Sequence, residues 1–213
     1  MTENENRWQV TTDTIQVRYA AEANTSCCLS CGSSLDLAEV QKEEIIVDLG
    51  SGRGAEVLKA ATKASHAYGI DFTEEMIETA KASAEKLEMK NAEFIYGAID
   101  KIPLPDDSVH VVISNCTINH AQDKQKVYSE ICRIMKPGGR FVVSDIIAEK
   151  QIPADIANDP EAIAGCYGGA ITKEPYFDAI SSAGFSEIEI LEESLPYDKS
   201  GVSVISLTLK GYK

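Results

Sequence analysis

Three glycines at alternating positions constrain the fold of this chain more than any other feature. Gly50, Gly52 and Gly54 follow an apolar run from Ile45 to Leu49 and precede a helix-like segment from Ala55 to Ala64. This order predicts a strand, a tight turn and a helix. Glycines at such a turn allow positive φ and a close approach of ligand to backbone, and amides at the start of the helix face that ligand. The turn therefore predicts a site for a nucleotide-like ligand.

The spacing of the glycines differs from that of dinucleotide-binding proteins. Their fingerprint has a third glycine three positions after the second, whereas Gly54 follows Gly52 by two. A second apolar stretch, residues 67–70, ends at Asp71. A carboxylate at the tip of a strand can accept hydrogen bonds from both hydroxyls of a ribose. We therefore expect a ligand with a free ribose.

The stretches VDLGSGRG and YGIDFTEEMIETA resemble the first two motifs of class I S-adenosylmethionine-dependent methyltransferases. The resemblance implies S-adenosyl-L-methionine as cofactor and S-adenosyl-L-homocysteine as product, with the adenine held after the third strand by Ile99 and Asp100. Another Rossmann-like nucleotide binder is the alternative. The cofactor-binding residues implied are Asp48, Gly50, Gly52, Gly54, Asp71, Phe72, Ile99, Asp100 and Asn115.

Strand-like and helix-like segments alternate along the chain, which predicts an α/β fold with a parallel sheet. Further strands are expected at 92–96, 109–114, 140–147, 185–195 and 202–209, and further helices at 11–24, 73–88, 123–135 and 173–183. The resemblance implies a Rossmann-like, mostly parallel seven-stranded sheet with helices on both faces and an antiparallel last strand. The apolar alternation slips between Val204 and Ile205, which predicts a bulge there.

The length of 213 residues favours a single globular domain. Within it, we expect a methyltransferase domain at 41–213, preceded at 1–40 by a frayed start, a helix over the cofactor and a cysteine-containing lid segment. No signal peptide or membrane span is evident, which predicts a cytoplasmic protein. The net charge of −14 disfavours nucleic acid and anionic membranes as partners and favours small molecules as substrates. Solubility alone is an equally good explanation of this charge.

The residues after the fourth predicted strand bear on the methyl acceptor. They read Ser114-Asn115-Cys116-Thr117, without the Pro-Pro-aromatic pattern typical of methylases that act on amino groups of bases. Acceptors that react through oxygen or carbon need a general base. His120 is the histidine nearest to this site in sequence, and it is either such a base or a loop histidine.

The six cysteines indicate a different acceptor. Cys27, Cys28 and Cys31 precede the first strand, Cys116 follows the fourth, and Cys166 lies between the fifth strand and the next helix, whereas Cys132 falls on the buried stripe of a helix. The segments that carry Cys116 and Cys166 are expected over the carboxyl edge of the sheet, so that distant thiols meet above the methyl donor. Thiolates bind soft, thiophilic centres such as trivalent arsenic.

Several stretches are similar to those of arsenite methyltransferases over nearly the whole chain: VRYAAEANTSCC, CGSSL, VVISNCTINH, KPGGRFVVSDI and AGCYGGAITKEPYFDAISSAGF. The resemblance implies arsenic detoxification by methylation of As(III) bound to the thiolates of Cys31 and Cys166. Cys27 and Cys28 match a pair found in many microbial members. An external thiol reductant, glutathione or a thioredoxin-like protein, would keep these cysteines reduced.

Longer members of that family carry another cysteine beyond the position of Lys213, so that the third arsenic ligand would be Cys27 or Cys28, or absent. With two thiolates the expected substrate is methylarsenite. For the loop with Cys27, Cys28 and Cys31, the alternatives are a zinc site, a redox pair or unliganded thiols. Cys116 either packs at the end of its strand or takes part in the chemistry. Two other functions stay open: methylation of a quinone-like organic molecule, or a non-catalytic metalloid or zinc-thiolate protein on the same fold.

Overall fold

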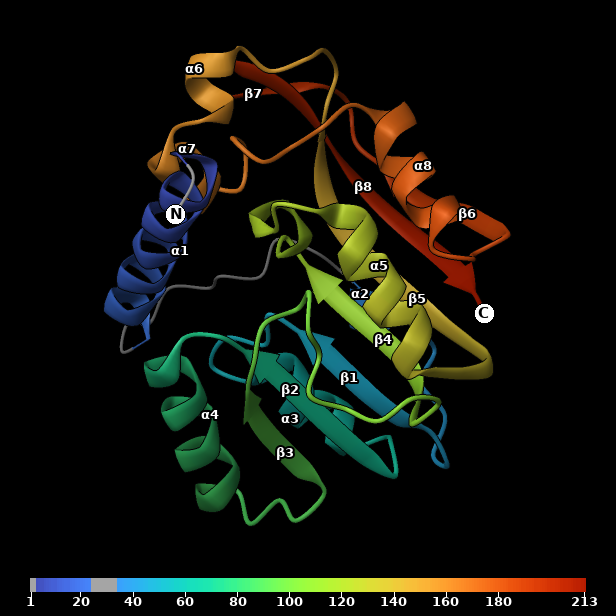
Figure 1. The fold of residues 1–213 in the computed structure, drawn as a ribbon. Helices are drawn as coiled ribbons and strands as arrows, with labels where there is room; N and C mark the ends of the chain where they lie inside the picture. The colour runs from blue at the N-terminus through green and yellow to red at the C-terminus, as the bar shows by residue number, and fades with distance from the viewer. Residues whose placement is uncertain (1–2, 24–33) are drawn as a thin grey trace.

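A single sheet forms the centre of the molecule (Figure 1). The structure, a computed structural model, describes residues 3–23 and 34–213, and within them eight strands follow the order β3-β2-β1-β4-β5-β8-β6, with β7 paired to β8. The strands are β1 (Ile45–Leu49), β2 (His66–Asp71), β3 (Ala92–Tyr96), β4 (Val109–Asn115), β5 (Met135–Ala148), β6 (Glu187–Glu193), β7 (Tyr197–Lys199) and β8 (Val202–Tyr212).

The pairing confirms the predicted topology. Strands β1 to β5 pair in parallel, whereas β8 is antiparallel to β5, β6 and β7. The described sheet has one strand more than the seven expected, because part of the connection predicted as a loop forms the short strand β7. The order reverses between β1 and β4, and ligands of such sheets bind beyond the carboxyl ends of the strands at that reversal.

Helices cover both faces of the sheet, as expected. Successive residues of β1 point to opposite faces: Ile46 packs in one cluster with residues of α2, α3 and α4, and Val47 packs in another with residues of α5 and α8. The helices are α1 (Glu3–Glu22), α2 (Ser34–Leu37), α3 (Ala55–Ala61), α4 (Glu74–Lys86), η1 (Ile118–His120), α5 (Lys124–Ile134), α6 (Ala154–Ala157), α7 (Pro160–Ala164) and α8 (Lys173–Ser182).

The first helix begins earlier than predicted. Residues 3–10, expected to be frayed, form the first half of α1. The helix packs against α7, where Ile15 contacts a cluster with Ile163 and Ala164, and Trp8 packs on the same cluster. Tertiary contacts therefore stabilise a segment whose own sequence pattern is weak, with Val17 exposed on the outer side.

The bulge predicted in the last strand is wrong. Strand β8 pairs with β5 in continuous register from Val204 to Tyr212. Val204 and Ile205 are both buried because they face opposite sides of the sheet, each covered by a different apolar cluster. The register shift of this region lies on β6 instead, between Ile190 and Glu192. Because both faces of β8 are buried, apolar residues occur at consecutive positions, and this interrupts the apolar alternation without a bulge.

A pair of glycine variants tests how the glycine turn packs on the sheet. Gly54 has a φ of 80°, and a Cβ there would lie 2.5 Å from the ring of buried Phe94; Gly138 has a φ of 78° with nothing within 4 Å. We expect Gly138→Ala to destabilise the fold by about 1 kcal/mol through backbone strain and Gly54→Ala by about 2–4 kcal/mol through strain and overpacking together. Urea denaturation measures both, and equal losses would contradict the packing role of Gly54.

Candidate functional site

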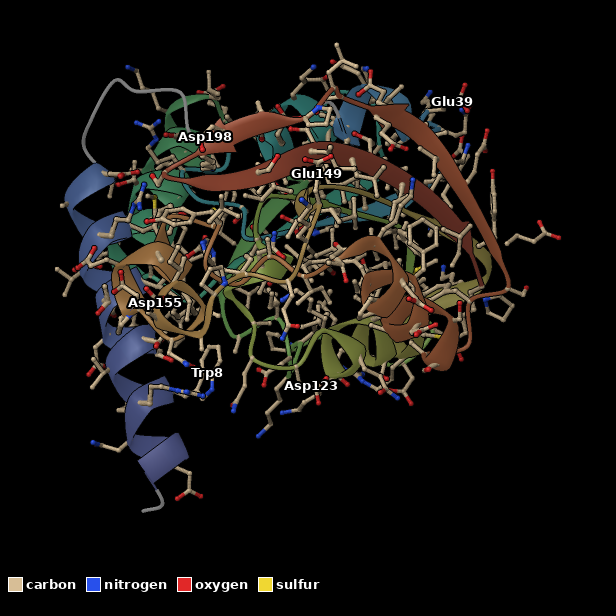
Figure 2. All side chains as sticks on the ribbon, turned by 90° about the horizontal axis from the view of Figure 1, so that it is seen from above. Trp8, Glu39, Asp123, Glu149, Asp155 and Asp198 are labelled. Atoms are coloured by element: carbon tan, nitrogen blue, oxygen red, sulfur yellow. The ribbon has the colours of Figure 1, made fainter. Side chains whose placement is uncertain are left out.

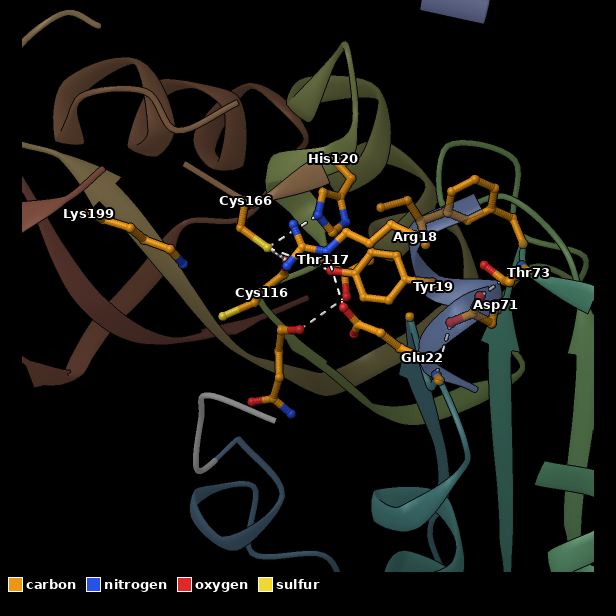
Figure 3. Close-up of a pocket in the computed structure, with 16 residues that line it drawn as sticks. Arg18, Tyr19, Glu22, Asp71, Thr73, Cys116, Thr117, His120, Cys166 and Lys199 are labelled. Carbon is orange, nitrogen blue, oxygen red and sulfur yellow. Dashed lines mark hydrogen bonds and ion pairs between the residues drawn. The ribbon is translucent and has the colours of Figure 1, made fainter. Parts of the chain in front are cut away.

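A pocket of about 410 Å³ lies beyond the carboxyl ends of β1, β2 and β4 (Figure 3). Residues of α1 close one side of it, and the turn after α7, at Gly165 and Cys166, closes another. Strand β7 contributes Lys199. At least six regions that are far apart in the sequence therefore meet at one cavity, at the edge where the strand order predicts a ligand.

The glycine turn forms one wall of this pocket. The amides of Gly50 and Ser51 donate hydrogen bonds to the carbonyl of Ile70 at 2.8 and 3.0 Å, which ties the end of β1 to β2. Gly50 and Gly52 line the cavity with φ values of 75° and 49°. Among the described residues, a Cβ on Gly52 would have no neighbour closer than 3.9 Å, so that its backbone is open to a ligand. Gly54 does not line the pocket.

Asp71 connects the glycine turn to the next helix. Its two carboxylate oxygens accept the amides of Gly52 and Thr73, each at 2.9 Å. The side chain also lines the pocket, and burial raises its pKa. Each oxygen has a second lone pair, which leaves room for ligand hydroxyls. This geometry fits the ribose contact predicted from the sequence.

Other residues predicted to bind the cofactor divide into two groups. Phe72, Ile99 and Asn115 line the pocket. The buried Oδ1 of Asn115 has no hydrogen-bond partner among the described residues, so that a ligand could donate a hydrogen bond to it. Asp100 lies outside this lining, and its carboxylate pairs with Lys126 at 2.9 Å. Asp48 is 4% exposed and also lies outside the lining.

Burial raises the pKa of Asp48 to about 8, and the nearby charges of Glu56 and Asp71 act in the same direction. The carboxyl group is therefore protonated in the free protein near neutral pH. A cationic ligand in the adjoining pocket would favour its ionised form.

Two thiols share the pocket, as the sequence predicts for the segments that carry them. Cys116 follows β4 and Cys166 follows α7, and both have left-handed backbone conformations, with φ of 56° and 71°. The Sγ of Cys166 lies 3.3 Å from the carbonyl oxygen of Cys116. Burial raises the pKa of Cys166 to about 11, so that the thiol is protonated in the free protein.

His120 and Tyr19 surround the Cys166 thiol. The Nε2 of His120 lies 3.2 Å from Cys166 Sγ, and the Tyr19 hydroxyl lies 3.9 Å from it. Burial lowers the pKa of His120 to about 4, so that the ring is neutral at physiological pH. An efficient general base needs a pKa near the working pH, and His120 in this environment is a weak one.

The structure places one of the four remaining cysteines. Cys27, Cys28 and Cys31 lie outside the described residues. Cys132 is on α5, packs against the core and does not line the pocket. In the described part of the chain, no group of three or more His, Cys, Asp or Glu side chains is arranged to hold a metal ion.

Sequence reasoning missed several residues of the lining, among them Arg18, Glu22 and Lys199. Arg18 and Glu22 form an ion pair along α1, one turn apart and on either side of Tyr19. Their helix was predicted to cover the cofactor, but these two residues were not placed on its contact face. For Lys199 the sequence held no signal, since its position depends on the unpredicted strand β7.

None of the described helices is both long and apolar enough to cross a bilayer.

The raised pKa of Asp48 predicts a pH-dependent stability. The unfolded chain loses this proton near the ordinary pKa of 3.8, whereas the folded protein keeps it to about pH 8. Stability therefore falls as pH rises across this window, by at most about 1.4 kcal/mol per unit. In Asp48→Asn this loss disappears, and the variant gains stability relative to the wild type between pH 5 and 8. Denaturation without cofactor measures the difference in stability between the variant and the wild type. Asp178→Asn, at an exposed position, is the control. A stability difference between Asp48→Asn and the wild type that does not change with pH would refute the prediction.

Curated relatives are similar to much of this chain. An arsenite methyltransferase of Halobacterium salinarum is 38% identical over 165 residues, which cover 76% of this chain and 42% of the relative. An arsenite methyltransferase of Mus musculus is 34% identical over 152 residues, which cover 66% of this chain and 40% of the relative. The chain thus spans about two fifths of the length of these relatives.

Solved structures share the fold. CrArsM, an arsenic(III) S-adenosylmethionine methyltransferase from Chlamydomonas reinhardtii, matches with a TM-score of 0.72 and 24% identity, over 94% of this chain and 73% of that one. The YcgJ protein of Bacillus subtilis matches with a TM-score of 0.69 and 19% identity, over 84% of this chain and 95% of that one. The family described as "Methyltransferase domain" matches residues 40–193. The chain therefore belongs to the methyltransferase domain family, with the Rossmann-like fold of its class I members.

Proposed function

We propose that this protein transfers the methyl group of S-adenosylmethionine to trivalent arsenic bound by its thiolates. The observation that carries the proposal is the meeting of Cys116 and Cys166 in the same pocket as the glycine turn and Asp71. The names of the curated relatives support arsenic as the acceptor. The acceptor is thus a small molecule, as the acidic charge of the chain also favours.

The pocket has features that suit the cofactor. The open backbone at Gly52, the carboxylate of Asp71 and the Oδ1 of Asn115, which has no partner among the described residues, provide the polar contacts, and Ile99 provides an apolar one. Phe72 lines the same wall. S-adenosylmethionine, when bound, supplies an electrophilic methyl group on a sulfonium. Asp48, Gly54 and Asp100 do not line the pocket, and we expect them to support the wall behind the ligand.

Thiols bind As(III) by exchange. A protonated Cys166 thiol that displaces hydroxide from arsenic forms an S–As bond, and its proton leaves with the hydroxide as water. The raised pKa of this thiol is therefore compatible with ligand exchange. Arsenic keeps its lone pair and is itself the nucleophile, so that methyl transfer requires no general base. Alignment of bound reactants can lower such a barrier by roughly 7–11 kcal/mol.

The number of thiolates decides between arsenite and methylarsenite. Cys116 and Cys166 are two thiols of the described pocket, and they leave the third position of arsenic for a methyl group or an oxygen. The resemblance instead implies Cys31 beside Cys166, with Cys27 or Cys28 in the third position, and these three cysteines lie outside the described residues. A glutathione-type or thioredoxin-like reductant would keep all of them as thiols.

The organic-acceptor alternative depends on His120 as a general base. Its lowered pKa and its contact with Cys166 Sγ both argue against that role. The structure offers no specific observation in favour of this alternative.

A serine variant tests the thiol chemistry. Because Cys166 reaches into the pocket, we expect Cys166→Ser to lower methylation of arsenite and of methylarsenite by about 100-fold or more, since the acceptor loses a ligand and its alignment. Affinity for S-adenosylhomocysteine should stay within about twofold. Chromatography with arsenic-specific detection measures the products.

Cys132→Ser is the matched control, since it removes a thiol from α5 outside the pocket. Full activity of Cys166→Ser would overturn the assignment of this residue. An absence of arsenic product in the wild type, with cofactor bound, would overturn the acceptor and favour an organic one. Preference for methylarsenite would indicate a two-thiolate site.

The ribose contact has its own test. Asp71→Asn replaces one carboxylate oxygen by an amide donor, and the loss of a charged acceptor should weaken S-adenosylhomocysteine binding roughly 10- to 100-fold. Asp100→Asn, which breaks an exposed ion pair with Lys126, should weaken it by less than about threefold. Calorimetric titration measures both. An Asp100→Asn loss as large as that of Asp71→Asn would support the adenine role implied by the resemblance.

A further inference from the structure

A second cavity, of about 540 Å³, lies beside α7 and shares no lining residue with the candidate active site. Trp8 of α1 and Ile163 of α7 form apolar parts of its wall, together with Ile152 and Ile171. Figure 2 shows Trp8 on the side of α1 that faces the rest of the molecule. Nothing in the proposed methyl transfer uses this cavity.

A buried cation lines the same cavity. Lys124, the first residue of α5, is only 8% exposed. In the described part of the chain, no hydrogen bond and no ion pair within 4.0 Å involves its ammonium group. Because Lys124 is largely withdrawn from solvent, its ammonium group has little water to bind outside the cavity that it lines, and a charged partner there would offset the cost of this burial.

The nearby carboxylates have other partners. Asp145 accepts hydrogen bonds from Asn119 Nδ2, the Ile146 amide and the Tyr176 hydroxyl. Asp123 accepts the amide of Lys126 as the N-cap of α5. Both carboxylates attract Lys124, but from beyond ion-pair distance. Burial lowers the pKa of Lys124 to about 8, so that most of the ammonium stays charged at neutral pH.

The lining as a whole has the character of a small-molecule site. Gln122, Gln151 and Thr172 add neutral polar groups to the apolar wall around Lys124. Ligand pockets of this size combine a mostly apolar wall with a few polar groups that orient the ligand. A carboxylate would give Lys124 the charge-assisted hydrogen bonds that it lacks, and an apolar body would cover Trp8 and the isoleucines.

We propose that this cavity binds a small organic carboxylate with an aromatic or aliphatic body, with Lys124 as the residue that receives the carboxylate. The site is separate from the methyl-transfer pocket but adjoins it. Ile163 and Gly168 of its wall flank the turn that carries Cys166. A ligand here would therefore contact the segment that positions this thiol.

Trp8 provides a direct test, since it is the only tryptophan of the sequence and lines the cavity. Benzoate is the probe, and benzamide is its neutral counterpart of the same shape. We expect a saturable change of Trp8 fluorescence with benzoate and binding of benzamide weaker by about tenfold or more, since only benzoate pairs with the ammonium. Calorimetric titration of the same two compounds is the second readout.

Two lysine variants separate the proposed contact from general charge effects. Lys124→Met should bind benzoate no better than benzamide. Lys126→Met removes the same charge from an exposed position on the same helix and should keep the preference for benzoate. Circular dichroism and S-adenosylhomocysteine affinity confirm folding, and Lys124→Gln serves if the methionine variant does not fold. The proposal would be overturned if the wild-type protein bound the two compounds equally or bound neither. It would also be overturned if Lys124→Met, or Lys124→Gln in its place, kept the preference for benzoate.

Discussion

The carboxylate of Asp71 is the interaction on which the cofactor side of the molecule depends. One oxygen accepts the amide of Gly52 in the turn after β1, and the other accepts the amide of Thr73 at the N-cap of α4. The two neighbouring β-α units are therefore held in one geometry by a single side chain. Because charge-assisted hydrogen bonds to backbone amides are short and strong, the open backbone at Gly52 is presented to the pocket in a defined position.

The thiol side depends on a buried polar network. Asn119 in η1 donates to Asp145 and to the carbonyl of Ile146 on β5, at 2.8 and 2.7 Å. Tyr176 of α8 adds a hydrogen bond to the same carboxylate, and Tyr128 of α5 bonds to Tyr176. This network fixes η1 over the sheet. His120 and the turn after β4 are thereby brought against Cys166.

Sequence patterns predicted most of the sheet and one half of the site. The strand at 45–49 and the strand at 92–96 lie where periodicity placed them, and the antiparallel last strand follows the predicted order. Gly52 and Asp71 were identified because both act within a few residues of a strand end. Residues 3–10 and β7 were missed because their structure depends on contacts with α7 and β8, which no local pattern encodes.

The sequence by itself determined an α/β fold with a parallel sheet and the position of the glycine turn, because local backbone demands and apolar periodicity specify both; the Rossmann-like arrangement was implied by the resemblance to methyltransferases. Only the tertiary structure decided that His120 and Tyr19 surround the Cys166 thiol, and that this thiol lies against the carbonyl of Cys116. It also decided that Gly54 serves packing against Phe94 and that Lys124 is buried. Desolvation and side-chain proximity arise from the packing of distant segments, which spacing along the chain does not specify.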